Sequence, residues 1–146
     1  MKRRWLTYIS IGILFGILDF YFPSHATIWL FAVWLVPIVP IILYQAKVSH
    51  SKKLSALASG LTWFIAVVFY YLTNVFQLAI GSSYEPWMSI SNYKSPHFWS
   101  NWKSTLLSYV LGHIIEWGII GVIGGSIIGF LVSFIFLFFS RKEVVK

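Results

Sequence analysis

The stretch from Thr105 to Phe139 constrains this chain more than any other. Its last 21 residues, from Ile119 to Phe139, carry no charged side chain. At about 1.5 Å per residue, a helix of this length crosses a hydrocarbon core of about 30 Å. Before Ile119, polar side chains recur at offsets of three and four and therefore share one helical face: Thr105, Ser108, Tyr109, Gly112, His113 and Glu116. One helix over 105–139 is thus predicted to join a polar face to a membrane-spanning segment.

Composition points to the membrane class. Of the 146 residues, 58% are hydrophobic and 10% are charged, whereas a soluble domain is about 25% charged. The net charge of +7 does not indicate a nucleic-acid partner, because the basic residues lie in short clusters between apolar runs. The absence of cysteine excludes disulfides and thiolate chemistry. We therefore expect membrane lipids, and no nucleic acid, among the partners of this chain.

Four apolar runs predict an all-α integral membrane protein, a single domain over 1–146 built as a four-transmembrane-helix bundle. The expected spans are about 5–22, 27–45, 54–80 and 105–139. The aromatic loop 81–103 is expected at the outer membrane surface. Of the 11 Lys and Arg residues, all but Lys94 and Lys103 lie at the two termini or in the 45–53 segment. The positive-inside rule then places both termini in the cytoplasm of a multi-pass cell-membrane protein.

Two of these runs allow an alternative or an irregularity. The basic start, the first apolar run and Ser24-His25-Ala26 together imitate a secretory signal peptide. Asp19 and the bulky residues 20–22 crowd the cleavage region, so we expect the first run to be retained as a span. Pro37 and Pro40 each remove an amide donor from the second run, which predicts a kink near residues 33–36.

Polar residues in or near the spans gather at the predicted outer level. An ionisable side chain inside a membrane costs roughly 2.5–3.5 kcal/mol and is a functional candidate by default. The hypothesis is a convergent outer-leaflet pocket built from Asp19, Asn74, Gln77, His113 and Glu116. The alternative is that His113 and Glu116 lie at the interface, in contact with water or paired with each other at i and i+3.

Metal and catalytic signatures are weak. His113 and Glu116 have the spacing of bundle metal ligands, but such sites take a second pair from another helix. No HExxH, histidine cluster or aspartate-rich motif is present, so we predict neither a metal site nor a cofactor. The nucleophile-elbow, P-loop and dinucleotide motifs are also absent. A serine–histidine–acid arrangement in space, with Ser91, Ser95 or Ser108 near His113, stays open.

Glycines at four-residue spacing predict close helix packing, either within the bundle or against a partner. They are Gly12 and Gly16 in the first span and Gly121, Gly125 and Gly129 in the last.

These observations favour a small membrane protein that acts as a non-catalytic subunit or binding module. It would pack against a membrane partner or a second copy, or hold a lipid or amphiphile at the outer leaflet. One alternative is a membrane-embedded enzyme acting on an amphiphile, with Asp19 or Glu116 as acid or base beside His113. A proton- or ion-coupled carrier is the third.

Overall fold

The fold is entirely helical over the residues that the computed structural model describes, which are 2–22, 27–81 and 85–143. The long helices are α1 (Lys2–Tyr21), α2 (Thr27–Ser49), α3 (Lys52–Gly81) and α5 (Gly112–Glu143). Between α3 and α5 lie two 3-10 turns, η1 (Pro86–Met88) and η2 (Ile90–Asn92), the short helix α4 (Phe98–Ser104) and the π-helical segment η3 (Thr105–Leu111). The prediction of an all-α chain is confirmed for these ranges.

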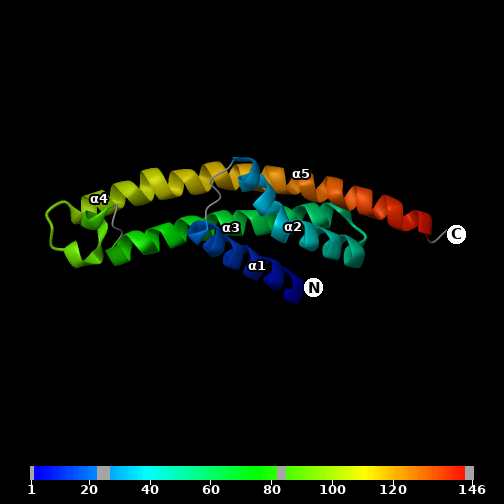
Figure 1. Ribbon diagram of the computed structural model, residues 1–146, viewed down its shortest axis with the longest axis horizontal. Coiled ribbons are helices and arrows are strands. Elements are labelled where there is room, and N and C mark those ends of the chain that lie inside the picture. The colour runs from blue at the N-terminus through cyan, green and yellow to red at the C-terminus, as the bar shows by residue number, and fades with distance from the viewer. Residues whose placement is uncertain (1, 23–26, 82–84, 144–146) are drawn as a thin grey trace.

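The centre of the fold is a long antiparallel pair of helices (Figure 1). One member is α3, and the other runs without interruption from Phe98 through α4 and η3 into α5. Within the described ranges these are the two helices long and apolar enough to cross a membrane. The predicted start of the last helix at Thr105 is wrong, because the helix begins at Phe98. Phe98 and Trp102, spaced by one turn, are buried against Met88, and this burial makes residues 98–104 helical rather than part of a loop.

The helices α1 and α2 cover one half of this pair, the half that holds the amino end of α3 and the carboxyl end of α5 (Figure 1). The helix α1 packs along α3, whereas α2 packs on both α3 and α5. Figure 1 also shows α2 changing direction along its length, and Pro37 and Pro40 lie inside it. Two missing amide donors within one turn account for such a bend.

A tight turn joins α2 to α3. The helix α2 continues to Ser49, beyond the predicted limit at residue 45. His50 then adopts a positive φ of 49°, and the Ser51 hydroxyl accepts a hydrogen bond from the Leu54 amide at 3.4 Å. The Ser51 side chain therefore caps the first turn of α3.

Glycines allow the helices to approach each other at their backbones. An added Cβ at Gly12 would lie 2.7 Å from the Thr62 carbonyl oxygen of α3, and one at Gly16 would overlap the Ala66 carbonyl. In α5, a Cβ at Gly129 would lie 2.8 Å from the Ala56 Cα. These are contacts that a larger residue cannot make without moving a backbone.

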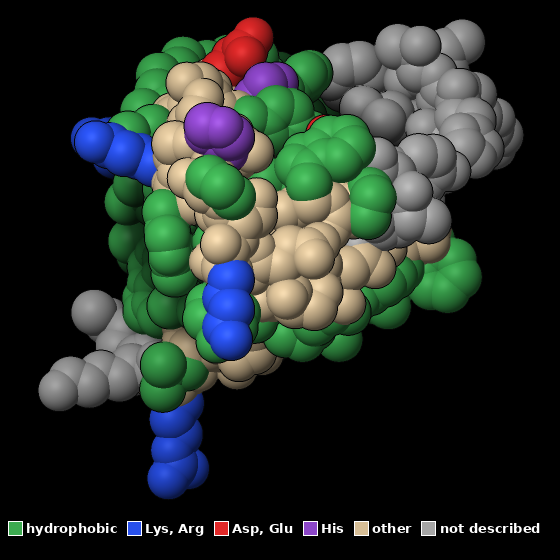
Figure 2. All heavy atoms as spheres, turned by 90° about the vertical axis from the view of Figure 1, so that its left-hand side faces the viewer, with side chains coloured by type: hydrophobic (Ala, Val, Ile, Leu, Met, Phe, Trp, Pro, Cys, Tyr) green, Lys and Arg blue, Asp and Glu red, His purple; other side chains and the backbone are tan. Residues whose placement is uncertain are grey.

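The surface that faces away from these contacts is apolar. On α5 the exposed large hydrophobic residues are Ile115, Trp117, Ile119, Ile120, Val122, Ile123, Ile127, Phe130, Leu131, Phe134, Ile135, Phe138 and Phe139. Figure 2, which looks onto the end with η1 and η2, shows hydrophobic side chains down the flanks and polar groups on the end face. Contiguous exposed patches of this extent are typical of membrane or protein interfaces.

Candidate functional site

Two adjacent tyrosines of α3, Tyr70 and Tyr71, form the centre of a cluster of polar and aromatic side chains. The Tyr70 ring meets the Phe20 ring of α1 edge to face at 5.4 Å. The Tyr71 ring lies 6.3 Å from that of Tyr109 and 5.6 Å from that of His113. Three parts of the chain, α1, α3 and the η3–α5 junction, thus meet where α1 ends. We refer to Asp19, Trp34, Tyr70, Tyr71, Tyr109 and His113 as the tyrosine cluster.

Asp19 enters the cluster from α1. It is half-buried and accepts a hydrogen bond from the Trp34 side chain of α2, whose indole can only donate. The Asp19 carboxylate also lies close enough to Tyr70 to interact with it electrostatically. Trp34 is itself held between the Trp63 ring, stacked at 5.4 Å, and the Phe15 ring, edge-on at 5.4 Å. A rigid aromatic side chain therefore fixes the position of this carboxylate.

His113 enters from the other side, directly after the π-helical segment. Its Nδ1 lies 2.7 Å from the Tyr109 carbonyl oxygen. Because a carbonyl oxygen only accepts, Nδ1 carries the proton, and in the neutral ring Nε2 is left as the acceptor. The His113 ring also packs on the Tyr109 ring at 4.6 Å. Segments of π-helix are rare and often occur at functional sites.

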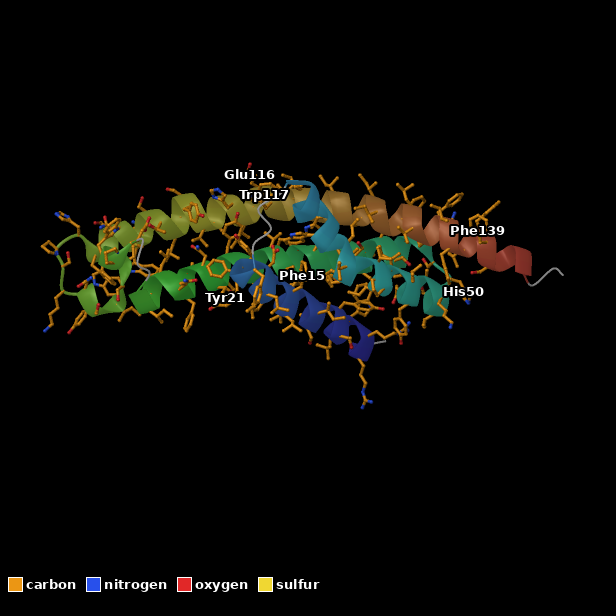
Figure 3. All side chains as sticks on the ribbon, viewed as in Figure 1. Phe15, Tyr21, His50, Glu116, Trp117 and Phe139 are labelled. Carbon is orange, nitrogen blue, oxygen red and sulfur yellow. The ribbon has the colours of Figure 1, made fainter. Side chains whose placement is uncertain are left out.

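Glu116 interacts electrostatically with Tyr71 but does not enter the interior of the cluster. It is exposed and points away from α3 (Figure 3). The physical reason is the glycine contact on the same helix. Nine residues separate Glu116 from Gly125, and at about 100° per residue they face opposite directions. Since Gly125 packs against Gly60 of α3, Glu116 must face outward. Glu116 is exposed, and the hydrogen bond that His113 makes is to the Tyr109 carbonyl oxygen through Nδ1.

Asn74 and Gln77 follow Tyr70 along α3 and are half-buried. The Asn74 Oδ1 is buried and has no hydrogen-bond partner within the described part of the chain. A buried acceptor without a donor is unfavourable by about 1–3 kcal/mol. The structure therefore brings Asp19 and His113 to the same pair of tyrosines, with an unsatisfied acceptor nearby on α3, while Glu116 lies apart. The functional roles of all five residues stay predictions.

Over residues 2–22, 27–81 and 85–143, the His, Asp and Glu side chains form no group of three that could hold a metal ion. His97 is exposed in the segment before α4. His25, a further ligand candidate, and the possible cleavage region 23–26 lie outside the described residues.

The five predicted glycines lie at helix contacts with α3. For Gly121 and Gly125, an added Cβ would come within 2.9 Å and 3.1 Å of the Trp63 ring. Gly12, Gly16 and Gly129 meet the α3 backbone, as described above. By contrast, Gly124 has nothing within 4 Å and lies off this contact.

Sequence reasoning missed a buried polar pair at the opposite end of the bundle. The Tyr8 hydroxyl donates to Gln45 Oε1 at 2.7 Å, and the two residues are 2% and 3% exposed. The available signal was Gln45 itself, an uncharged polar residue at the end of an apolar run, which requires a partner when it is buried. It also missed Trp34 and Tyr71, which the sequence does not distinguish from the many other aromatic residues of the apolar runs. The spacing of Tyr70, by contrast, places it on the same helical face as Asn74 and Gln77.

Comparisons of the chain with protein-family models, with curated proteins and with solved structures find no match. Function is therefore inferred from the geometry alone.

Proposed function

We propose that the chain is a multi-pass protein of the cell membrane, with four crossings and both termini in the cytoplasm. Two observations support this placement. The first is the apolar surface that α5 exposes from Ile115 to Phe139. The second is the distribution of the basic residues, nine at the termini and the 45–53 segment against two elsewhere.

Orientation can be tested directly because the chain contains no cysteine. Single cysteines at Ser51 and at Ser91 should differ in their reaction with a membrane-impermeant thiol reagent applied to intact cells. We expect labelling at position 91, which is exposed, and protection at position 51 until the cells are opened. The reverse pattern would overturn the orientation, and equal labelling at both positions would contradict an odd number of crossings between them.

Within the membrane we propose a non-catalytic binding module that holds the polar head of an amphiphile at the tyrosine cluster. The observation that carries this proposal is the half-buried Asp19 carboxylate, positioned by Trp34 and flanked by Tyr70. Asn74 Oδ1 on α3, which has no donor among the described residues, adds a second acceptor. Carboxylate and amide oxygens both accept hydrogen bonds, so the matching head group donates them and carries positive charge.

An ammonium head group has this chemistry, and aromatic rings beside a carboxylate favour it further through cation–π attraction. Trp34, Tyr70 and Phe20 supply such rings around Asp19. The acyl chain of the amphiphile would lie along the exposed apolar surface of the helices. The proposed ligand class is therefore a single-chain or double-chain lipid with a primary or quaternary ammonium group.

The test compares two lysolipids with the same acyl chain, lysophosphatidylethanolamine and lysophosphatidic acid, on the detergent-solubilised full chain by native mass spectrometry. We expect the ammonium lipid to bind more tightly, and Asp19→Asn to weaken its binding about tenfold or more, as for a lost charged hydrogen bond. Glu116→Gln is the matched control, because it removes the same charge from an exposed side chain whose interaction with the cluster is electrostatic only, through Tyr71. Equal losses in both variants, or no preference between the lipids, would contradict the proposal.

A partner-packing role is the second form of the same proposal. It is supported by Gly112 and Gly124, which leave space on the surface of α5 where another helix can approach. Purification in a mild detergent tests it: a stoichiometric partner, or a dimer that Gly124→Leu disrupts, supports this form, and a monodisperse monomer argues against it. The enzyme alternative gains no support from Glu116, whose side chain is exposed and points away from α3.

A further inference from the structure

The end of the bundle opposite the tyrosine cluster holds a second set of buried polar groups. Tyr8 and Gln45 are almost completely buried there and satisfy each other through a 2.7 Å hydrogen bond. Tyr8 also packs with Ile41 and Ala58, and its ring meets that of Trp5 edge to face at 5.8 Å. This part of α1 is therefore firmly attached to α2 and α3.

Arg4 lies one helical turn before Tyr8 and is half-buried. Its Nη1 is buried and has no hydrogen-bond partner within the described part of the chain. Arg4 interacts electrostatically with the Tyr8 hydroxyl, but no hydrogen bond joins that hydroxyl to the buried Nη1. A buried guanidinium donor without an acceptor is unfavourable, and an anion or an acceptor from outside would satisfy it.

The chain does not provide that anion from the described side chains. It has four acidic residues. Asp19 belongs to the tyrosine cluster, Glu85 precedes η1 and Glu116 faces outward from α5. The side chain of Glu143 lies outside the described residues.

The neighbouring basic side chains are either exposed to solvent or already stabilised by aromatic rings, unlike Arg4. Arg3, Lys47 and Lys53 are exposed to solvent. The Lys52 ammonium lies 4.2 Å from the centre of the Phe134 ring and 5.7 Å from that of Phe130, so aromatic faces already stabilise it. Arg4 alone among these cations combines partial burial with an unpaired buried donor.

We propose that Arg4 is the centre of a binding site for a phosphate group at the basic end of the bundle. A guanidinium binds phosphate oxygens through two parallel N–H donors, which is stronger and more directional than attraction to a surface lysine. Exposed Arg3 and Lys47 raise the local concentration of anions without fixing one. Given the proposed membrane placement, on which this assignment to a lipid rests, the phosphate source is an anionic phospholipid of the cytoplasmic leaflet.

The experiment uses the full chain in a neutral detergent with dihexanoyl phosphatidylglycerol as the probe and inorganic phosphate as a competitor. Binding is measured by native mass spectrometry and by the shift of the thermal unfolding midpoint. Arg4→Gln should weaken phosphatidylglycerol binding about tenfold or more, whereas Arg3→Gln, the same charge change at an exposed neighbouring position, should change it by less than about threefold. Millimolar phosphate that displaces the probe would identify the bare anion as the ligand. Persistence of the probe would identify the lipid.

Equal weakening in the two variants would overturn the proposal, because it would show attraction to the basic end as a whole. Unchanged binding in Arg4→Gln would overturn it as well. If Arg4→Gln does not fold, Arg4→Lys and Arg3→Lys decide, since lysine keeps the charge and loses the paired donors. Only the change at position 4 should weaken binding. The ammonium-lipid assay on Asp19 reports the other site, so either proposal can fail without the other.

Discussion

The two halves of this molecule are held together in different ways. In the half that α1 and α2 cover, called the inner half, α1 packs on α3 and α2 packs on α3 and α5, and helix backbones come into contact at the glycines. In the outer half, residues 70–81 of α3 face α4 and η3, and the contacts are made by large aromatic side chains. Contacts between backbones leave no room for a ligand, whereas aromatic side chains with polar ends bring donors and acceptors to one place.

The polar groups follow this division only in part, because Arg4 Nη1 and Ser59 Oγ of the inner half also have no partner among the described residues. In the inner half the Tyr8–Gln45 pair is closed, with donor and acceptor both used. In the outer half Asn74 Oδ1 has no partner among the described residues, and Asp19, where α1 ends at the boundary between the halves, is bonded to a single indole. The inner half is therefore expected to determine global stability and to offer the single proposed anion site at Arg4, whereas the tyrosine cluster is expected to provide the chemistry that binds an ammonium group. The predictions that follow test this division, from the largest effect to the smallest.

The largest effect is expected from an added methyl group at the closest helix contact. Gly16→Ala places a Cβ where the Ala66 carbonyl already lies, so α1 must move away from α3. Overpacking of this kind costs about 3 kcal/mol, and we expect a clearly lower thermal unfolding midpoint in detergent. The control is Gly124→Ala, where the new Cβ meets nothing within 4 Å.

The control variant should be neutral, or more stable by up to about 1 kcal/mol, because alanine is the better helix former. If both variants melt at the same temperature as the natural chain, the contact between α1 and α3 is looser than described, and the distinction between the halves loses its basis.

A smaller loss is expected at the closed polar pair. Tyr8→Phe removes the donor and leaves the buried Gln45 acceptor unpaired, which costs about 1–3 kcal/mol. Tyr44→Phe makes the same chemical change on a residue that is 51% exposed, and its stability should be unchanged. The free energies of unfolding of the two variants in denaturant provide the measurement. An equal effect in both would mean that Gln45 finds another donor.

The smallest effect is local. Trp102→Phe removes the indole donor to the Met88 carbonyl oxygen, a 2.9 Å hydrogen bond that ties α4 to η1. A single hydrogen bond contributes about 1 kcal/mol, so amide exchange in residues 85–97 should increase about fivefold. The global melting midpoint should not change if the outer half adds little to it. Trp99→Phe, at a 71% exposed position, is the control and should leave the amide exchange rates unchanged. A lower global melting midpoint in the Trp102 variant would contradict the prediction, because it would show that the two halves unfold as one cooperative unit.

The helical nature of the chain could be read from the sequence, since long apolar runs separated by polar segments leave few other structures open. The residue at which the last helix begins could not be read from the sequence. The sequence from Phe98 to Ser104 contains aromatic and polar residues suited equally to an interfacial loop. It becomes helical because Phe98 and Trp102 bury their rings near Met88, a residue that the sequence places ten positions earlier.

The candidate site shows the same limit. A helical face containing both His113 and Glu116 was a local inference from spacing, and spacing alone does not say which face a neighbouring helix covers. The glycine spacing contained that information, because Gly125 and Glu116 face opposite ways on one helix. The two patterns had to be combined to exclude Glu116 from the interior.

The sequence by itself determined an all-helical chain, the uncharged segment from Ile119 to Phe139 and the asymmetric distribution of basic residues, since these depend on residue type and order alone. Only the tertiary structure decided that α3 lies against the glycines, that Asp19 meets Trp34 and Tyr70, and that the Arg4 guanidinium is left without a partner. The physical reason is that whether a side chain is paired or buried depends on a second residue as well as on its own type. A side chain far away in the sequence supplies the second member, and its position is set by how closely the helices can pack.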